Sequence, residues 1–246
     1  MPAEMEILSG LTIKKFKKRI IYSQTNFCTI NYIGEKILWR LNMGHFITFE
    51  GIDGSGKSTQ IALLKKRIEQ HGQRCSLTAE PSTGPIGVMI RQCLSGRMKV
   101  DEKTIAALFA SDRLDHLLNE TDGICSKTNQ GIHVICDRYI LSSYAYQSVR
   151  VSFEWVKQLN SAALDTLRPD CHIFIDIEPE MAIERMAKER FHTELFETKE
   201  RLTEVRNRYL ELIEQLKEEE NIIIINGSQT IGQISNDIWK NVSALF

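Results

Sequence analysis

The sequence predicts an α/β fold, in which a doubly wound, five-stranded parallel sheet is flanked by helices. Short apolar runs rich in β-branched residues alternate with stretches of helical periodicity from residue 43 onward, a pattern typical of a parallel sheet. A glycine-rich stretch, Gly51–Thr59, stands between the first apolar run and the first helical stretch and has the spacing of a phosphate-binding loop. Together these observations predict a nucleotide-binding fold of the P-loop NTPase type.

Strands are expected where short β-rich runs are bounded by turn residues, at 45–49, 74–79, 131–137, 171–177 and 221–226. We expect run 74–79 to be a buried strand. Gly72 should interrupt the first helix, Asp101 should cap a later one, and Pro179 stands where another begins. The expected helices run from Gln60 to Gly72, Ile86 to Ser95, Asp101 to Leu117, Phe153 to Leu167 and Glu180 to Glu189, then through Tyr209 to Leu216, and finally after Gln229.

The first 42 residues differ in composition from the rest of the chain. They hold seven basic and three acidic residues, a net charge of +4, so residues 43–246 carry −5 of the total of −1. An Arg-rich transit peptide is an alternative, but lysine and aromatic residues dominate here. The sequence from Met43 shows no internal repeat or low-complexity linker, so we expect residues 43–246 to form one domain, and Met43 directly precedes its first predicted strand. Residues 1–42 are then an extension without a catalytic role that need not be ordered, and translation could begin at Met43.

Charge and cysteine content narrow the class of protein. A net charge of −1 gives no reason to expect nucleic acid or an acidic membrane as a partner. The six cysteines are scattered without a C-x-x-C pair, which is typical of reduced thiols in a cytoplasmic protein. No apolar run approaches the roughly twenty residues of a membrane span.

The glycine-rich stretch carries chemistry that follows from its residue types. Gly51, Gly54 and Gly56 allow turns in which successive backbone N–H groups converge on phosphate oxygens at the start of a helix. Lys57 can reach the β- and γ-phosphates of ATP, and the Ser58 hydroxyl can bind Mg²⁺. The alternative is a chance glycine turn. The predicted nucleotide-binding residues are Gly51, Ile52, Asp53, Gly54, Ser55, Gly56, Lys57, Ser58 and Thr59.

Further motifs follow in order along the chain: Glu80-Pro81, Leu108 to Arg113, Asp137-Arg138-Tyr139, Ser142 to Gln147, and Arg206 to Leu210. With the stretch Phe49 to Asp53, they resemble the thymidylate kinase family over about 200 residues from Met43 to the C-terminus. The resemblance implies transfer of the ATP γ-phosphoryl group to dTMP, giving dTDP and ADP, with Mg²⁺. It also implies a homodimer.

The resemblance assigns roles around the reacting phosphates. It implies that Asp137 holds Mg²⁺, a hard cation that prefers oxygen ligands, and that Arg138 contacts the phosphates being joined. Because Asp137 ends a predicted strand, it should open towards the phosphate loop. A surface salt bridge at a strand end is the alternative for this pair. Asp53 is implied to contact the 3′ end of the deoxyribose.

The resemblance also assigns the acceptor and adenine contacts. Phe109 is implied to stack on thymine and Arg113 to bind its edge, although a core phenylalanine beside a snorkelling arginine is the alternative. Arg91 is implied to grip the acceptor monophosphate. The remaining implied contacts are Pro81, Ser142 and Gln147 on the acceptor side, and Ser228 and Gln229 near the adenine.

Family members differ in where the catalytic arginine lies. Some place a basic residue in the loop at the position of Gly54, so this chain resembles the type that supplies the charge from a lid. Arg185, Lys188 and Arg190 are the candidates. The stretch Phe191 to Phe196 departs from the lid of many bacterial members, so the choice among the three stays open.

Three rival functions are another kinase of the same fold, a GTPase switch and a silent nucleotide-binding regulator. A nucleoside kinase of the same fold would need a base near the acceptor, and Glu50 is the candidate. Another pyrimidine monophosphate could also be the acceptor. A GTPase switch is disfavoured because the chain has no Asn-Lys-x-Asp motif. A silent nucleotide-binding regulator is disfavoured by the intact Lys57, Ser58, Asp137 and Arg138.

Overall fold

A computed structural model describes residues 43–189 and 198–246. Within these residues, five parallel strands form one sheet in the order β2-β3-β1-β4-β5. The strands are β1 (Phe46–Glu50), β2 (Cys75–Ala79), β3 (His133–Asp137), β4 (Cys171–Asp176) and β5 (Ile222–Asn226). The predicted five-stranded parallel sheet is therefore confirmed. The predicted extension 1–42 and the lid candidate Arg190 lie outside the described residues.

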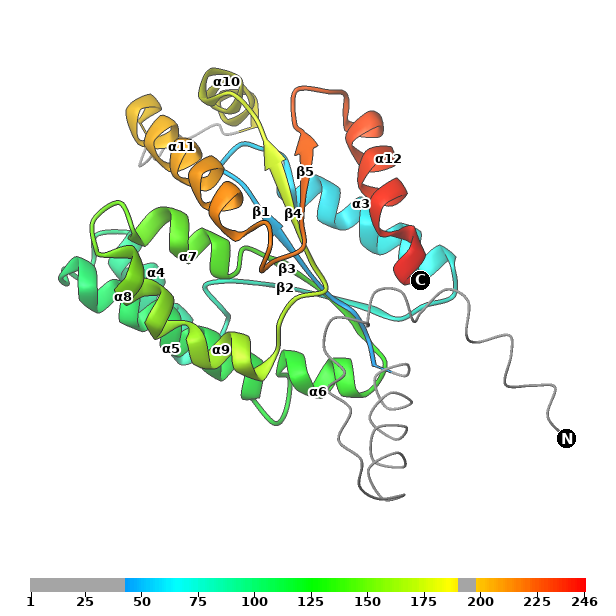
Figure 1. Cartoon of the computed structure of the whole chain (residues 1–246), viewed down its shortest axis with the longest axis horizontal. Coiled ribbons are helices and arrows are strands. Elements are labelled where there is room, and N and C mark those ends of the chain that lie inside the picture. The colour runs from blue at the N-terminus through cyan, green and yellow to red at the C-terminus, as the bar shows by residue number, and fades with distance from the viewer. Residues whose placement is uncertain (1–42, 190–197) are drawn as a thin grey trace, which may run out of the picture. The chain divides into compact units, whose positions relative to one another are not determined.

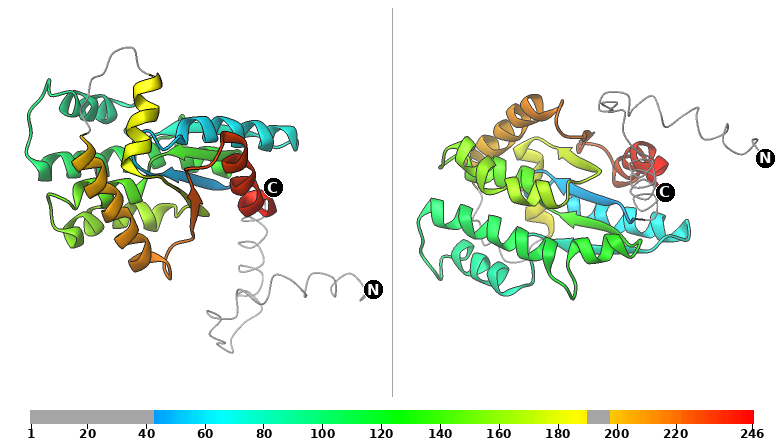
Figure 2. Two further views of the ribbon diagram at one scale, coloured as in Figure 1. Left: turned by 90° about the horizontal axis from the view of Figure 1, so that it is seen from above. Right: turned by 60° about the horizontal axis from the view of Figure 1, so that its bottom comes forward.

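Two layers of helices cover the sheet (Figure 1), and the two further views in Figure 2 show the same layers. One layer contains α3 and α12, and the other contains α5, α7 and α11 with the shorter helices around them. The helices are α3 (Lys57–Gln70), α4 (Pro85–Leu94), α5 (Glu102–Leu118), α6 (Ile124–Asn129), α7 (Ile140–Gln147), α8 (Phe153–Leu159), α9 (Ser161–Thr166), α10 (Pro179–Glu189), α11 (Lys199–Leu216) and α12 (Ile231–Val242), and the 3₁₀ helix η1 (Ser243–Leu245) follows.

Strand β1 lies in the middle of the sheet and is buried over its whole length. Its side chains alternate between the two faces, as the pleat of a strand requires. Ile47 and Phe49 belong to the apolar cluster under α3 and α12, whereas Phe46 belongs to the cluster on the other face. Glu50 shares the face of Phe46, so its carboxylate points towards α7 and α11.

Several predicted boundaries and caps are confirmed. Asp101 caps α5 by accepting a hydrogen bond from the Lys103 N–H over 2.8 Å, α10 begins at Pro179, and α4 ends just before Ser95. Gly72 follows the end of α3 with a φ of +77°. None of the described helices is both long enough and apolar enough to cross a membrane.

Two predictions were wrong. Strand β2 was expected to be buried, but it lies at the edge of the sheet and Leu77 is 40% exposed. The stretch 153–167 was expected to be one helix, but it divides into α8 and α9 at Asn160, whose side chain turns inward to bind Arg113. Some predicted ends also shift: β2 begins at Cys75, β3 at His133 and β5 at Ile222, β4 ends at Asp176, and α3 begins at Lys57.

Candidate active site

The phosphate loop connects the carboxyl end of β1 to α3. Gly54 and Gly56 both have positive φ values, of +77° and +93°. A Cβ atom at Gly54 would lie 2.5 Å from the backbone oxygen of Ala182, the first turn of α10, so this position has no room for a side chain. The structure thus gives a physical reason why no basic residue extends from the loop at Gly54.

Lys57, the first residue of α3, bends back over this loop. Its Nζ donates to the backbone oxygens of Gly51, at 3.1 Å, and Ile52, at 3.2 Å. Burial lowers the pKa of Lys57 to about 8, and the nearby charge of Arg138 acts in the same direction. Because burial and Arg138 disfavour the charged form of Lys57, a polyphosphate in the loop would stabilise it.

Ser58 and Asp137 meet across the carboxyl ends of β1 and β3. The Ser58 hydroxyl donates to Asp137 Oδ2 over 3.3 Å. Asp137 Oδ1 is buried and has no hydrogen-bond partner among the described residues. A hydroxyl beside an unpartnered carboxylate oxygen is a suitable donor set for a hard divalent cation, so these two residues fit the predicted Mg²⁺.

Arg138 follows directly and has an unusual backbone conformation, with a φ of +68°. Its Nη2 donates to Asp53 Oδ1 over 2.7 Å and its Nη1 to the Gly51 carbonyl over 3.0 Å. The guanidinium also lies over the ring of Tyr146, 5.0 Å from its centre. A left-handed non-glycine residue is strained unless its surroundings hold it in place, and these contacts fix the guanidinium beside the phosphate loop.

Two adjoining pockets open at this edge of the sheet. One, of about 280 Å³, contains the loop residues Asp53, Gly54, Gly56, Lys57, Ser58 and Thr59, with Asp137, Arg185 and Met186. The other, of about 340 Å³, contains the predicted acceptor residues Pro81, Phe109, Arg113, Ser142 and Gln147. Asp53, Glu80 and Arg138 line both. The predicted nucleotide and acceptor residues are thus brought together on either side of the Asp53–Arg138 ion pair.

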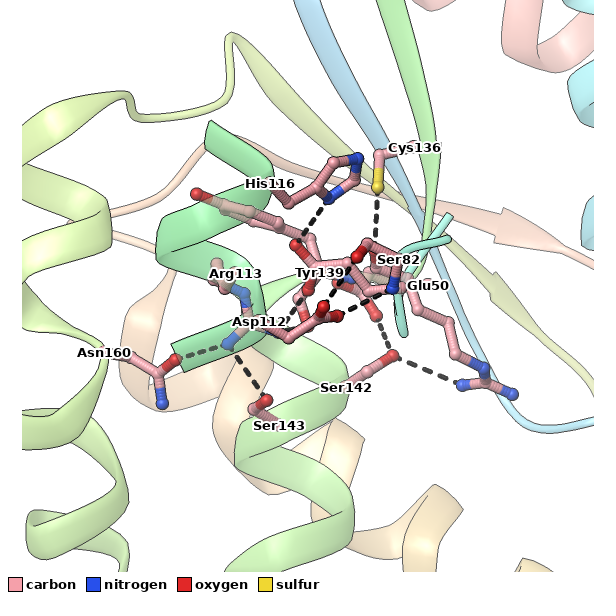
Figure 3. Close-up of polar contacts among 12 residues, drawn as sticks. Glu50, Ser82, Asp112, Arg113, His116, Cys136, Tyr139, Ser142, Ser143 and Asn160 are labelled. Atoms are coloured by element: carbon pink, nitrogen blue, oxygen red, sulfur yellow. Dashed lines mark hydrogen bonds and ion pairs between the residues drawn. The ribbon is translucent and has the colours of Figure 1, made fainter. Parts of the chain in front are cut away.

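Arg113 is more deeply buried than a base-binding arginine at a pocket surface would be, with 1% of its surface exposed. Its Nη2 donates to Glu80 Oε2 over 2.5 Å, and its Nη1 to Ser143 and Asn160 (Figure 3). Burial acts to lower the pKa of Arg113, but the charge and hydrogen bond of Glu80, together with Tyr139 and Glu50, outweigh it and the net shift is upward. Nε has no hydrogen-bond partner within the described part of the chain.

A buried polar group lies beneath the acceptor pocket. Glu80, His116 and Cys136 bring potential metal-binding atoms within 4.8 Å of one another. Figure 3 shows His116 and Cys136. However, Glu80 is already paired with Arg113, and His116 Nε2 lies 2.6 Å from the Thr78 hydroxyl. Burial raises the pKa of the Cys136 thiol well above its usual value. We therefore describe this group as part of the polar network that supports the pocket.

A family model for thymidylate kinase matches residues 49–238. The chain belongs to the thymidylate kinase family. A probable thymidylate kinase of Methanocaldococcus jannaschii is 38% identical over 195 residues, which cover 78% of this chain and 93% of that protein. A thymidylate kinase of Mycoplasmoides gallisepticum is 32% identical over 214 residues, 84% of this chain and 97% of that protein. A thymidylate kinase of Caldicellulosiruptor saccharolyticus is 40% identical over 146 residues, which cover 58% of this chain and 69% of that protein.

Not every predicted residue of this kinase lines a pocket. Arg91 Nη1 donates to the backbone oxygens of Pro81 and Ser82, which places it beside the acceptor pocket rather than among the lining residues described. Ser228 and Gln229 make local contacts in the turn after β5. Arg185 donates to the Gly227 carbonyl over 2.8 Å and approaches Ser55 O at 3.5 Å, so it bridges this turn and the phosphate loop. The exposed Lys188 is absent from both sets of lining residues.

The thymidylate kinase site also contains residues that sequence reasoning missed. Tyr146 lies one helical turn after Ser142 on α7, and this spacing could have placed it on the pocket side. Leu94, Glu102 and Ile105 come from α4 and α5, and Arg201 comes from the first turn of α11. No motif spacing singles out Arg201, whose Nη2 donates to the backbone oxygen of Tyr146 over 3.3 Å.

Proposed function

We propose that this chain transfers the γ-phosphoryl group of ATP to dTMP, forming dTDP and ADP. The observation that carries the proposal is that Asp53 and Arg138, ion-paired at 2.7 Å, line both pockets. A triphosphate held by the loop and a monophosphate in the adjoining pocket would bring their reacting phosphates to the same guanidinium. Family membership supports the same reaction.

Groups in the acceptor pocket support a pyrimidine. Phe109 supplies a flat apolar surface, and Pro81, Ile105 and Leu94 add apolar walls. Gln147 Oε1 is buried and has no hydrogen-bond partner among the described residues. A buried acceptor that stays unpaired costs about 1–3 kcal/mol of free energy. The ring N–H of thymine would supply the hydrogen bond that Gln147 Oε1 lacks. This contact and the predicted contact of Arg113 with the base remain proposals.

The proposed chemistry needs no general base, because the attacking phosphate oxygen of a monophosphate is already anionic. Lys57, Arg138 and Arg185 would surround the transferred group with positive charge, which favours phosphoryl transfer. Ser58 and Asp137 would hold Mg²⁺, which neutralises charge on the phosphates. Glu50, the base that a nucleoside kinase would need, is 0% exposed and lies outside both described sets of pocket-lining residues. This position favours a monophosphate acceptor over a free nucleoside.

A panel of acceptors tests the proposal. ADP formation from ATP and Mg²⁺ is measured with dTMP, dUMP, dCMP, dGMP and thymidine, each at the same concentration. We expect dTMP to be turned over fastest. Faster turnover of thymidine than of dTMP would contradict the proposal, and so would the absence of turnover with every monophosphate. Omitting Mg²⁺ from the dTMP reaction should abolish ADP formation.

We also propose an oligomeric state and a cellular location for the chain. The homodimer implied by the family is supported by apolar side chains exposed on α4, where Val88 is 45% and Met89 43% exposed. Sedimentation equilibrium tests it, and a mass of 28.2 kDa at all concentrations would argue against it. A cytoplasmic location is supported by the scattered cysteines, since Cys75, Cys93, Cys125, Cys136 and Cys171 are all free thiols.

A further inference from the structure

Glu50 is a buried carboxyl group at the phosphate-binding end of the sheet. It is the last residue of β1, directly before the loop glycine Gly51, and no part of it is exposed. Burying a carboxylate is costly unless hydrogen bonds compensate. Burial raises the pKa of Glu50, although the Ser142 hydroxyl and the charge of Arg138 act to lower it. The contacts of Glu50 indicate why a carboxylate is kept at this buried position despite the free-energy cost of its burial.

The contacts of Glu50 converge on the backbone and side chain around Arg138. Oε1 accepts the Tyr139 N–H over 3.0 Å, the peptide group that immediately follows Arg138. Oε2 accepts the Ser142 hydroxyl over 2.5 Å (Figure 3), and that same Ser142 oxygen accepts from Arg138 Nη1 over 3.3 Å. One carboxylate therefore fixes both the peptide after the strained residue and the hydroxyl beside its guanidinium.

A further hydroxyl ties this arrangement to α11. Tyr209 OH lies 2.7 Å from Ser142 Oγ and 3.2 Å from Glu50 Oε2, and Tyr209 is fully buried. Burial raises the pKa of Tyr209 well above its usual value, so the phenol stays protonated and can donate. Strand β1, helix α7 and helix α11 thus meet at Glu50.

We propose that Glu50 is a positioning residue for phosphoryl transfer, which holds Arg138 at the boundary of the two pockets through Tyr139 N–H and Ser142. The proposal rests on the proposed function, because it assigns Glu50 a part in that reaction. A purely structural residue would affect the stability of the whole domain. Glu50 is instead proposed to affect catalysis by fixing the position of the Arg138 guanidinium.

The substitution Glu50→Gln tests this, because glutamine keeps the shape but replaces one acceptor oxygen by an NH₂ group, so that either Tyr139 N–H or Ser142 loses its acceptor. We expect kcat for dTMP to fall about tenfold or more, with smaller changes in KM. The double variant Glu50→Gln with Arg138→Met should be no slower than Arg138→Met alone, since both remove the same contribution. The exposed Glu184→Gln on α10 is the matched control and should leave kcat unchanged.

Two kinetic outcomes would overturn the proposal: a kcat of Glu50→Gln equal to that of wild type, or additive losses in the double variant. If Glu50→Gln does not fold, Ser142→Ala removes the bridging hydroxyl and should give the same drop in kcat and the same lack of additivity. A second readout is independent of activity. The Nε–H NMR resonance of Arg138, assigned by its loss in Arg138→Met, should shift in Glu50→Gln and not in Glu184→Gln. An unshifted resonance contradicts the positioning role even if the wild-type protein acts on another acceptor.

Discussion

Arg113 donates to Glu80 over 2.5 Å, and both side chains are almost completely shielded from solvent. A pair of this kind connects α5 to the segment that follows β2, and it forms the floor of the acceptor pocket. When one partner of a buried ion pair is removed, the other remains charged in a medium that solvates it poorly. The pair therefore makes the stability of the domain depend on a residue that also lines the site.

We predict that Glu80→Gln lowers the free energy of unfolding by about 3–5 kcal/mol, because Arg113 is left buried without its carboxylate. The same substitution at Glu214 on α11, whose exposed carboxylate pairs with Lys217 just after the helix at 2.7 Å, should leave the free energy of unfolding nearly unchanged. Urea unfolding followed by circular dichroism measures both. Equal losses in the two variants would show that the buried pair contributes little.

Binding of ATP should be accompanied by proton uptake in mildly alkaline solution. The pKa of Lys57 is about 8 in the ligand-free protein, so about half of the Lys57 side chains are neutral at pH 8. A polyphosphate raises this pKa, so binding should take up about half a proton at pH 8 and close to one at pH 9. Calorimetry with a nonhydrolysable ATP analogue, in buffers of different ionisation enthalpy, measures the uptake. Lys57→Met is the control, and uptake that persists in it would assign the proton to another group.

Gly54 should tolerate a methyl group much less well than Gly72. Both residues have a φ of +77°, so the backbone strain of an alanine is matched at the two sites. A Cβ at Gly54 meets Ala182 O at 2.5 Å, whereas at Gly72 it meets no described atom within 4 Å. We expect Gly72→Ala to lower the free energy of unfolding by about 1–2 kcal/mol. Gly54→Ala should cost about 1–3 kcal/mol more and should also lower kcat. Thermal unfolding measures the stability of both variants, and steady-state kinetics measures their kcat. Similar losses of stability and of kcat at Gly54 and Gly72 would refute the steric explanation.

Removal of residues 1–42 should leave catalysis intact. The family match begins at residue 49, and within 43–189 and 198–246 the residues that line the two pockets lie between 53 and 201. The kinetic constants of the chain starting at Met43 should therefore equal those of the full chain, measured side by side with dTMP and ATP. A loss of activity on truncation would mean that the extension belongs to the working enzyme.

The central part of the fold was predictable because its signals are local. β1, the loop and α3 follow from a β-rich run, three glycines and an amphipathic stretch, and Asp137 could be placed at the ligand edge because parallel strands end together. Edge exposure is not local: run 74–79 has the composition of a buried strand, but β2 pairs only with β3 in the described sheet, so Leu77 faces solvent.

Site residues that belong to sequence motifs could be predicted. Those that reach the site only because segments distant in sequence pack together could not. Phe109 and Ser142 were found from ordered motifs, and both line the acceptor pocket. The break at Asn160 could not be found, because the partner that holds the Asn160 side chain inward, Arg113, is 47 residues away in sequence. Arg201 was missed for a similar reason, since only the packing of α11 against α7 brings it to the pocket.

The central place of β1 also has a consequence for how the chain is made. β1 pairs with β3, which begins at residue 133, and with β4, which begins at residue 171. Neither neighbour exists while the N-terminal part of the chain is leaving the ribosome, and contacts that are distant in sequence form late. The strand that anchors the phosphate loop thus stays unpaired until β3, which ends at Asp137, has been made. We expect nucleotide binding only after that point of synthesis.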